Sequence, residues 1–240
     1  MLNKQRFSFA YIVYGALIIV FAYFVNRTDS LSIFSIFGVM LILSFLITRN
    51  TNDEDVDLPY YWSILLRALM LFSIPNLSDD VYRFIWDGRL IFNGLDPFAA
   101  IPYDYIDAGK GLTTELFEKL NSQEYFSVYP PLNQLIFFFS VLINPESEIV
   151  SIVFLRLVIF AFEVGNIRLI RKLLKHYGLP QKYGLLYALN PMVILELTGN
   201  LHFDQHLRVC VQTPRAVNHP KWNSIISTVL LVKVHNCMYI

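Results

Sequence analysis

Long apolar runs alternate with polar segments along the chain, and their lengths predict helices that cross a membrane. A helix that spans a bilayer needs about 20 mostly apolar residues. Apolar runs close to this length occupy residues 8–25, 31–48, 60–76, 149–167 and 183–199. A further run at residues 132–143 is short, so we expect it to be re-entrant or interfacial rather than spanning.

The polar segments between these runs predict how the helices connect. Residues 26–30 form a short link, so we expect the first two runs to pair as an antiparallel hairpin. The acidic segment 49–59 is typical of a solvated loop. Segment 77–130 is longer than most connections, and we expect a helix over 79–92 and an amphipathic stretch over 113–126. The predicted fold is therefore all-α: a polytopic transmembrane helical bundle with a long external loop carrying amphipathic helices.

The distribution of basic residues predicts the orientation in the membrane. Lys4 and Arg6 place the N-terminus in the cytoplasm, because loops rich in Lys and Arg stay inside. Three spans then place the loop 77–130 outside, and the basic cluster at 168–182 returns inside. The last apolar run crosses outward again, so residues 200–204 are expected on the same side as that loop.

Composition supports a membrane protein and excludes some other classes. Hydrophobic residues make up 55% of the chain and charged residues 16%, with a mean hydropathy of +0.47. Soluble domains average about 25% charged residues. The net charge is zero, so nucleic acid is not an expected partner, and two cysteines are too few for a disulfide framework.

The stretch from Ser78 to Arg89 (SDDVYRFIWDGR), directly after the third apolar run, is the strongest candidate for chemistry. The adjacent carboxylates of Asp79 and Asp80 suit proton abstraction from a hydroxyl group or metal binding. The alternative is that Ser-Asp-Asp only begins a helix, since these residues favour a first turn.

The residues that follow favour a functional interpretation of this stretch. On a helix, Asp80, Arg83 and Asp87 share one polar face, which is more than helix capping requires. Trp86 suits the interface between water and lipid. We therefore expect Arg83, Trp86 and Asp87 to contact substrate.

Two features elsewhere each have two interpretations. Tyr129, followed by two prolines, lines a lipid or sugar groove or marks a rigid helix start. Arg67, in the middle of an apolar run, must face the protein interior or a wet cavity. It belongs either to a structural ion pair or to a contact with a substrate phosphate.

The last apolar run carries a third group of candidates. Pro191 is expected to kink this run and to free a backbone carbonyl. Glu196 lies close to the outer end, and His202 and Asp204 follow it. A His-x-Asp pair at this place suits a metal ion or a phosphate.

These motifs resemble those of a known family. The stretch Ser78–Arg89, with Gly94–Phe98 (GLDPF) after it, resembles the first external loop of GT-C-type membrane glycosyltransferases, above all the bacterial polyprenyl-phosphate-mannose-dependent mannosyltransferases. Residues 129–132 (YPPL) and 190–202 (NPMVILELTGNLH) look like later motifs of that family, in the same order. The resemblance covers residues 60–205, in round numbers.

The resemblance implies a reaction and roles for residues. Mannose, or another hexose, would pass from a polyprenyl phosphate to a glycan or lipid acceptor with inversion, at the external face of the bacterial inner membrane. Asp79 or Asp80 would be the catalytic base, and we favour Asp80. The candidate cations for the phosphate are Arg67, Arg83, Arg89 and His202, and the candidate substrate contacts in the last motif are Glu196, Asn200, His202 and Asp204.

The expected partners are a lipid-linked sugar donor, an acceptor and membrane lipid. No cofactor is required by the sequence, and no nucleotide-binding loop is expected for a lipid donor. A divalent metal at Asp79, Asp80 and His202 is an alternative that the sequence leaves open, but these ligands are too few to argue for it.

The composition changes after Asp204. All twenty Phe lie at or before residue 203, and residues 205–240 contain no acidic residue. We therefore expect residues 1–204 to be the N-terminal part of a GT-C-like domain and residues 205–240 to be an atypical tail, of the kind a frameshift produces.

Two further functions stay open. One is a catalytically inactive membrane subunit or lipid-binding scaffold. The other is a transporter that uses Arg67 and Glu163 as intramembrane charges, which predicts inverted repeats that are not visible in the sequence.

The predicted topology can be tested with a reporter fused after Lys175. We expect the fusion to report a cytoplasmic location, because the surrounding basic cluster stays inside. A reporter at the same position that reads as external contradicts the topology.

Overall fold

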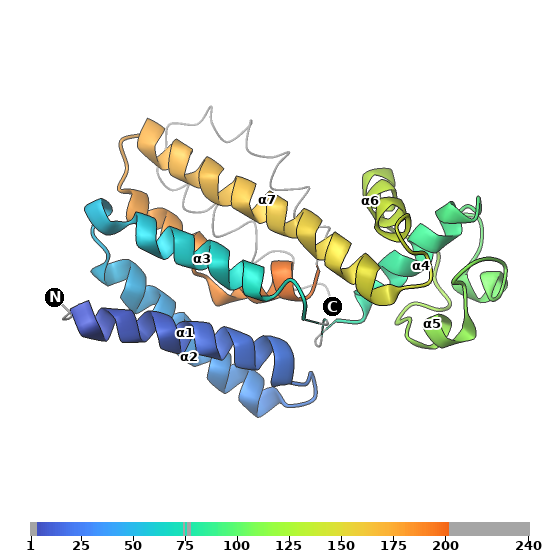
Figure 1. Cartoon of the computed structure of the whole chain (residues 1–240), viewed down its shortest axis with the longest axis horizontal. Coiled ribbons are helices and arrows are strands. Elements are labelled where there is room, and N and C mark those ends of the chain that lie inside the picture. The colour runs from blue at the N-terminus through green and yellow to red at the C-terminus, as the bar shows by residue number, and fades with distance from the viewer. Residues whose placement is uncertain (1–3, 74, 76–77, 202–240) are drawn as a thin grey trace. The chain divides into compact units, whose positions relative to one another are not determined.

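The computed structural model describes residues 4–73, 75 and 78–201, and these residues form helices joined by turns (Figure 1). No strand occurs among them. The all-α prediction is therefore confirmed for the described part of the chain.

Helices α1 (Lys4–Phe24) and α2 (Ser30–Asn50) pair as the predicted hairpin, and they run side by side in Figure 1. Asp29 caps α2 by accepting a hydrogen bond from the Ser32 N–H at 3.1 Å. Of the described helices, α2 alone is both long and apolar enough to cross a membrane by length and composition. The number of crossings expected from the sequence therefore remains a prediction.

Helix α3 (Asp57–Leu69) follows a 3₁₀ turn (η1, Asp53–Asp55) whose acidic side chains are exposed, as expected of a solvated loop. The helix ends seven residues before the predicted boundary at residue 76. The predicted length of this helix was wrong, because the residues after Leu69 form tight turns. In these turns the Ser73 N–H donates to the Met70 carbonyl at 3.1 Å.

The long polar segment contains helix α4 (Asp80–Phe92), close to its predicted bounds. A 3₁₀ turn (η2, Pro102–Tyr105) and a single helical turn (α5, Thr114–Glu118) follow it. The amphipathic stretch expected over 113–126 is therefore mostly irregular, and the reason is that backbone carbonyls of Ser122 and Tyr125 bond to a side chain of α4.

Helix α6 (Pro131–Val141) packs against α4 at very close range. At Gly88, a Cβ atom would lie 2.4 Å from the backbone oxygen of Phe137. The glycine therefore allows the two helix backbones to approach more closely than any other residue type would permit.

Helix α7 (Glu148–His176) is longer than the predicted span and carries the first part of the basic cluster on its last turns. The final apolar run is not one helix: it is divided into η3 (Gln181–Gly184), α8 (Leu185–Ala188) and η4 (Val193–Gly199), a π-helical segment. The break between α8 and η4 falls at Pro191, where a kink was expected.

The basic end of α7 and the acidic loop lie together. Arg171 pairs with Asp57 at 2.5 Å and lies over the ring of Tyr60, and the Lys182 N–H donates to Asp53 at 3.0 Å. The acidic loop and the basic end of α7 are therefore neighbours in the described part of the chain.

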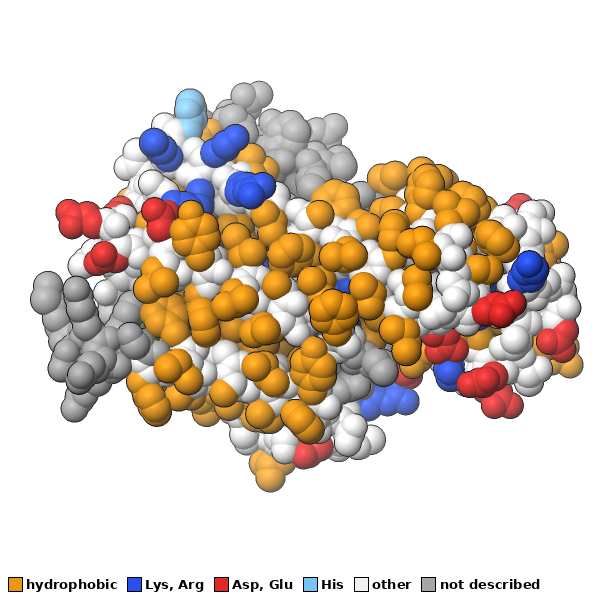
Figure 2. All heavy atoms as spheres, viewed as in Figure 1, with side chains coloured by type: hydrophobic (Ala, Val, Ile, Leu, Met, Phe, Trp, Pro, Cys, Tyr) orange, Lys and Arg blue, Asp and Glu red, His pale blue; other side chains and the backbone are white. Residues whose placement is uncertain are grey.

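Large apolar side chains cover much of the surface between the charged groups (Figure 2). Orange side chains gather over α1, α2, α3 and α7 in this view, while charged ones gather beyond them. The most exposed of the apolar residues include Phe9, Phe24, Leu31, Phe34, Ile42 and Phe72. Such a continuous apolar surface marks contact with lipid or with another protein.

The close approach at Gly88 predicts a large effect of adding one methyl group. Gly88→Ala should destabilise the protein by about 1–3 kcal/mol, because the new Cβ meets backbone that cannot turn aside. Gly38→Ala in α2 is the control, since no atom lies within 4 Å of its added Cβ. Thermal unfolding in detergent measures both, and equal melting temperatures for the two variants would contradict the packing at Gly88.

Candidate functional site

Asp79 and Asp80 lie at the beginning of α4, and each carboxylate has a partner from a distant segment. Arg27, in the link between α1 and α2, forms an ion pair with Asp79. The Asn121 side-chain amide donates to Asp80 at 2.7 Å. Asp79 precedes the helix without making a side-chain capping bond, so helix initiation alone does not account for it.

Sequence reasoning did not identify Arg27 or Asn121. The available signal for Arg27 was its place in a link predicted on the same side of the membrane as the long loop. Asn121 carried no such signal, because only the folding of the loop brings it to α4.

Arg83 and Asp87 lie inside the protein and bind each other. Arg83 Nε donates to Asp87 at 2.8 Å, and its Nη1 donates to the carbonyl oxygens of Ser122 and Tyr125, both at 2.9 Å. The two side chains are 3% and 0% exposed. Asp80, Arg83 and Asp87 were predicted to share one polar face, but they do not share one environment. The loop after α5 covers Arg83 and Asp87.

The buried Asp87 carboxylate also organises the entry to α6. Ser127 Oγ donates to it at 2.5 Å and Gln134 Nε2 at 2.8 Å. Burial raises the pKa of Asp87, while the charge of Arg83 and these hydrogen bonds act in the opposite direction. In this structure Arg83 and Asp87 hold segment 122–134 onto α4. Their predicted contacts with substrate remain a prediction.

Trp86 and Arg89 are also buried, at 0% and 2% exposure. Trp86 packs near Phe117 inside the protein. A side chain at the interface between water and lipid would have to lie at the protein surface. Arg89 Nη1 donates to the Gly111 carbonyl at 2.5 Å, and burial lowers its pKa, opposed by Glu148 and Glu146. The predicted surface position of Trp86 was wrong because the 109–120 segment covers this face of α4.

Tyr129 lies half-buried in an aromatic cluster. Its ring meets Phe84 edge-on at a centroid distance of 5.0 Å and Phe137 at 5.5 Å, while Phe84 and Phe137 stack on each other at 4.6 Å. This packing supports the interpretation as a rigid helix start, and the groove-lining role remains a prediction.

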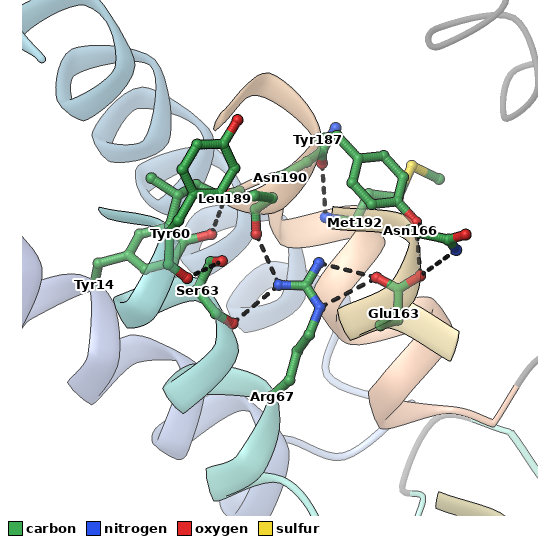
Figure 3. A network of polar contacts seen from close by, with 11 residues as sticks. Tyr14, Tyr60, Ser63, Arg67, Glu163, Asn166, Tyr187, Leu189, Asn190 and Met192 are labelled. Atoms are coloured by element: carbon green, nitrogen blue, oxygen red, sulfur yellow. Dashed lines mark hydrogen bonds and ion pairs between the residues drawn. The ribbon is translucent and has the colours of Figure 1, made fainter. Parts of the chain in front are cut away.

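Arg67 forms a structural ion pair inside the protein. Figure 3 shows its guanidinium facing Glu163, with Nε and Nη2 at 3.1 and 3.0 Å from the same carboxylate oxygen and both side chains fully buried. Tyr187 donates to the other Glu163 oxygen at 2.6 Å. Of the two interpretations offered by the sequence, the structure realises the ion pair.

The same network stabilises the break at Pro191. Proline lacks an N–H, and the Met192 N–H donates to the Asn190 side chain at 2.9 Å, so the last carbonyls of α8 lose their backbone donors. Arg67 Nη1 donates to the Ala188 carbonyl at 2.8 Å, and Tyr14 donates to the Leu189 carbonyl at 2.6 Å. Figure 3 shows both donors directed toward the broken segment.

Arg156, a second buried arginine, joins the segment before Asp79 to the last predicted motif. It donates to the Met70 carbonyl at 2.6 Å and the Gly199 carbonyl at 2.9 Å, and it also bonds to Ser73. Asn200 follows as a buried residue and Glu196 is half-buried on η4. His202 and Asp204 lie outside the described residues.

Metal ligation is not evident in the described part of the chain. Between residues 4 and 201, with the gaps given above, no group of three or more His, Cys, Asp or Glu side chains could hold a metal ion. The arrangement that the site offers is instead a pair of adjacent carboxylates, one beside a cation and one beside an amide.

Comparison with protein families agrees with the motifs. A model of the family described as alpha-(1->6)-mannopyranosyltransferase, N-terminal domain, matches residues 6–231. No curated protein and no solved structure matches the chain. The predicted relationship to mannosyltransferases is thereby confirmed, while the division of the chain after residue 204 stays a prediction.

The buried ion pair predicts a strong response to loss of one charge. Glu163→Gln should destabilise the protein by about 3–5 kcal/mol, because Arg67 would keep its charge without a buried counter-charge. Replacing both residues by Met should recover part of this loss. Glu115→Gln is the control, since Glu115 is 82% exposed beside Lys119.

Thermal unfolding and the yield of monodisperse protein in detergent measure these effects. The assignment fails if Glu163→Gln melts at the same temperature as Glu115→Gln.

Proposed function

Because the chain belongs to the alpha-(1->6)-mannopyranosyltransferase family, we propose that it transfers mannose from a polyprenyl-phosphate donor to a hydroxyl group of a glycan or lipid acceptor. The observation that carries this proposal is the Asp79–Asp80 pair, fixed at the start of α4 by Arg27 and Asn121. Adjacent carboxylates with defined partners suit a base that must be oriented toward a hydroxyl group.

The proposed step is a single displacement. A carboxylate takes the proton of the acceptor hydroxyl as its oxygen attacks the anomeric carbon of mannose. The bond from that carbon to the phosphate oxygen breaks, and the configuration inverts. The products are the mannosylated acceptor and a polyprenyl phosphate, which carries away the electron pair of the broken bond.

Asp80 is the better candidate for the base. The Asp79 carboxylate lies against the guanidinium of Arg27, and the side-chain amide of Asn121 donates to the Asp80 carboxylate at 2.7 Å. This amide donor orients the Asp80 carboxylate at the start of α4. Asp79 then serves to keep Arg27 beside the site.

The same geometry revises the choice of phosphate-binding cation. Arg67 and Arg83 are buried and bound to carboxylates, so neither can reach a lipid phosphate without losing its partner. Arg27 is 59% exposed and adjacent to Asp79. We therefore place the leaving phosphate near Arg27, and His202 remains a candidate from the sequence alone.

Several features support insertion of more than one helix into the membrane. Helix α1 has 21 residues and α7 has 29, which correspond to about 32 and 44 Å of helix. Exposed apolar side chains are frequent on α1 and α2, and α7 exposes Ile149, Leu157 and Leu169. Arg67, Glu163 and Arg156 bind protein groups within the bundle, as ionisable residues at membrane depth must.

In this proposal Asp79 and Asp80 lie at the external face. The basic end of α7, which contacts the acidic loop 53–57, lies on the cytoplasmic side in this proposal.

Asp80→Asn tests the catalytic role. We expect transfer of mannose from a polyprenyl-phosphate mannose donor to fall by about 10²–10⁴-fold, because the amide cannot accept the proton. The measurement is formation of mannosylated acceptor by the purified protein in detergent or liposomes. Asp55→Asn, in the exposed acidic loop, should leave the rate unchanged.

The comparison also separates the enzyme from an inactive membrane subunit or lipid-binding scaffold. Normal expression with loss of transfer supports the enzyme. If Asp80→Asn transfers mannose as fast as Asp55→Asn, Asp80 is not the base, and if the unaltered chain transfers none, the scaffold becomes the better proposal.

A further inference from the structure

We infer that Arg156 is a positioning residue for the proposed reaction. It fixes the turn Met70–Ser73, which precedes Asp79 and Asp80 in the chain, against the segment that carries Asn200. The expected effect on mannosyl transfer rests on the proposed function, whereas the bridge between the two segments rests on the contacts of Arg156. Neither the sequence motifs nor the family description assigns a role to this residue.

One guanidinium bridges two segments that are far apart in the chain. Its Nη1 donates to the Met70 carbonyl at 2.6 Å, to the Ser73 carbonyl, and to Ser73 Oγ at 3.0 Å. Its Nη2 donates to the Gly199 carbonyl at 2.9 Å. The side chain is fully buried, so these backbone oxygens replace the water that would otherwise solvate the charge.

Both segments lead directly to candidate site residues. Asp79 follows Ser73 after six residues, which limits their separation to about 20 Å even in a fully extended chain. Asn200 follows Gly199 immediately. A shift of the guanidinium would therefore displace the Met70–Ser73 turn, which precedes the acid pair in the chain, relative to Gly199 and Asn200.

The segment around Gly199 packs against Met70 and leads into a constrained residue. A Cβ at Gly199 would lie 2.7 Å from the Cε atom of Met70, so the two segments are in close contact beside Arg156. Leu201 is fully buried and has a φ of 60°, a left-handed conformation that a leucine adopts only when its surroundings impose it. The π-helical turns of η4 precede it, and such turns occur frequently at functional sites.

Lysine cannot reproduce this bridge. A guanidinium presents several donors in a rigid plane, whereas an ammonium group is a compact point charge. Arg156→Lys would keep the positive charge but could not place two fixed nitrogens on both the Met70–Ser73 turn and Gly199. The matched control is Tyr14→Phe, which removes one buried hydrogen bond to Leu189 in the same broken region and leaves the Arg156 contacts intact.

The test is steady-state mannosyl transfer together with hydrogen exchange of the full chain. For Arg156→Lys we expect kcat to fall by about 100-fold, the effect of displacing reacting groups by roughly 1 Å, with KM for the donor nearly unchanged. Exchange should accelerate in residues 70–73 and 193–201 and not in α4. Tyr14→Phe should accelerate exchange near Leu189 and keep the unaltered kcat.

Each outcome decides the inference. A kcat for Arg156→Lys equal to that of Tyr14→Phe overturns it, because the residue would then be only structural. If Arg156→Lys does not fold, Ser73→Ala replaces it. This variant removes the Oγ contact with Arg156 together with the hydrogen bond from Ser73 Oγ to the Met70 carbonyl. A lowered kcat supports the inference and an unchanged kcat overturns it. If the unaltered chain transfers no mannose, the proposed function fails, and exchange alone decides whether Arg156 joins the two segments.

Discussion

The buried ion pair between Arg67 and Glu163 is the interaction on which the helical assembly depends. Both side chains are fully buried, and a charge in such surroundings is tolerated only with a partner and further hydrogen bonds. Arg67 lies on α3 and Glu163 on α7, and the same guanidinium binds the Ala188 carbonyl beside the break at Pro191. The pair thus determines where three segments meet, and it compensates for the backbone bonds that the proline removes.

The long polar segment is also organised by a buried ion pair, formed by different residues. Arg83 and Asp87 form a buried pair four residues apart on α4, and their remaining hydrogen-bonding capacity binds segment 122–134. This buried pair explains why so much irregular chain can pack over one helix. It also places Asn121 next to Asp80, so the internal pair shapes the site without facing it.

The candidate site was therefore predicted in part. Asp79 and Asp80 stand out in the sequence because two carboxylates follow an apolar run directly. Arg27 and Asn121 do not stand out, since their importance comes from contacts across 52 and 41 positions. Arg83 and Asp87 were recognised as important, but helical spacing places them on a polar face and cannot say whether that face is open or covered.

The sequence by itself determined the helical class, the hairpin of the first two helices, the location of α4 and the acidic pair that begins it, because apolar periodicity, short links and local charge are local properties. Only the tertiary structure decided that α3 ends at Leu69, which donors satisfy the carbonyls freed beside Pro191, and that Arg67 pairs internally. Those outcomes depend on which distant donors satisfy freed carbonyls and buried charges. Arg156 illustrates the difference: the sequence analysis did not single it out, and only the fold showed that its partners are Met70, Ser73 and Gly199.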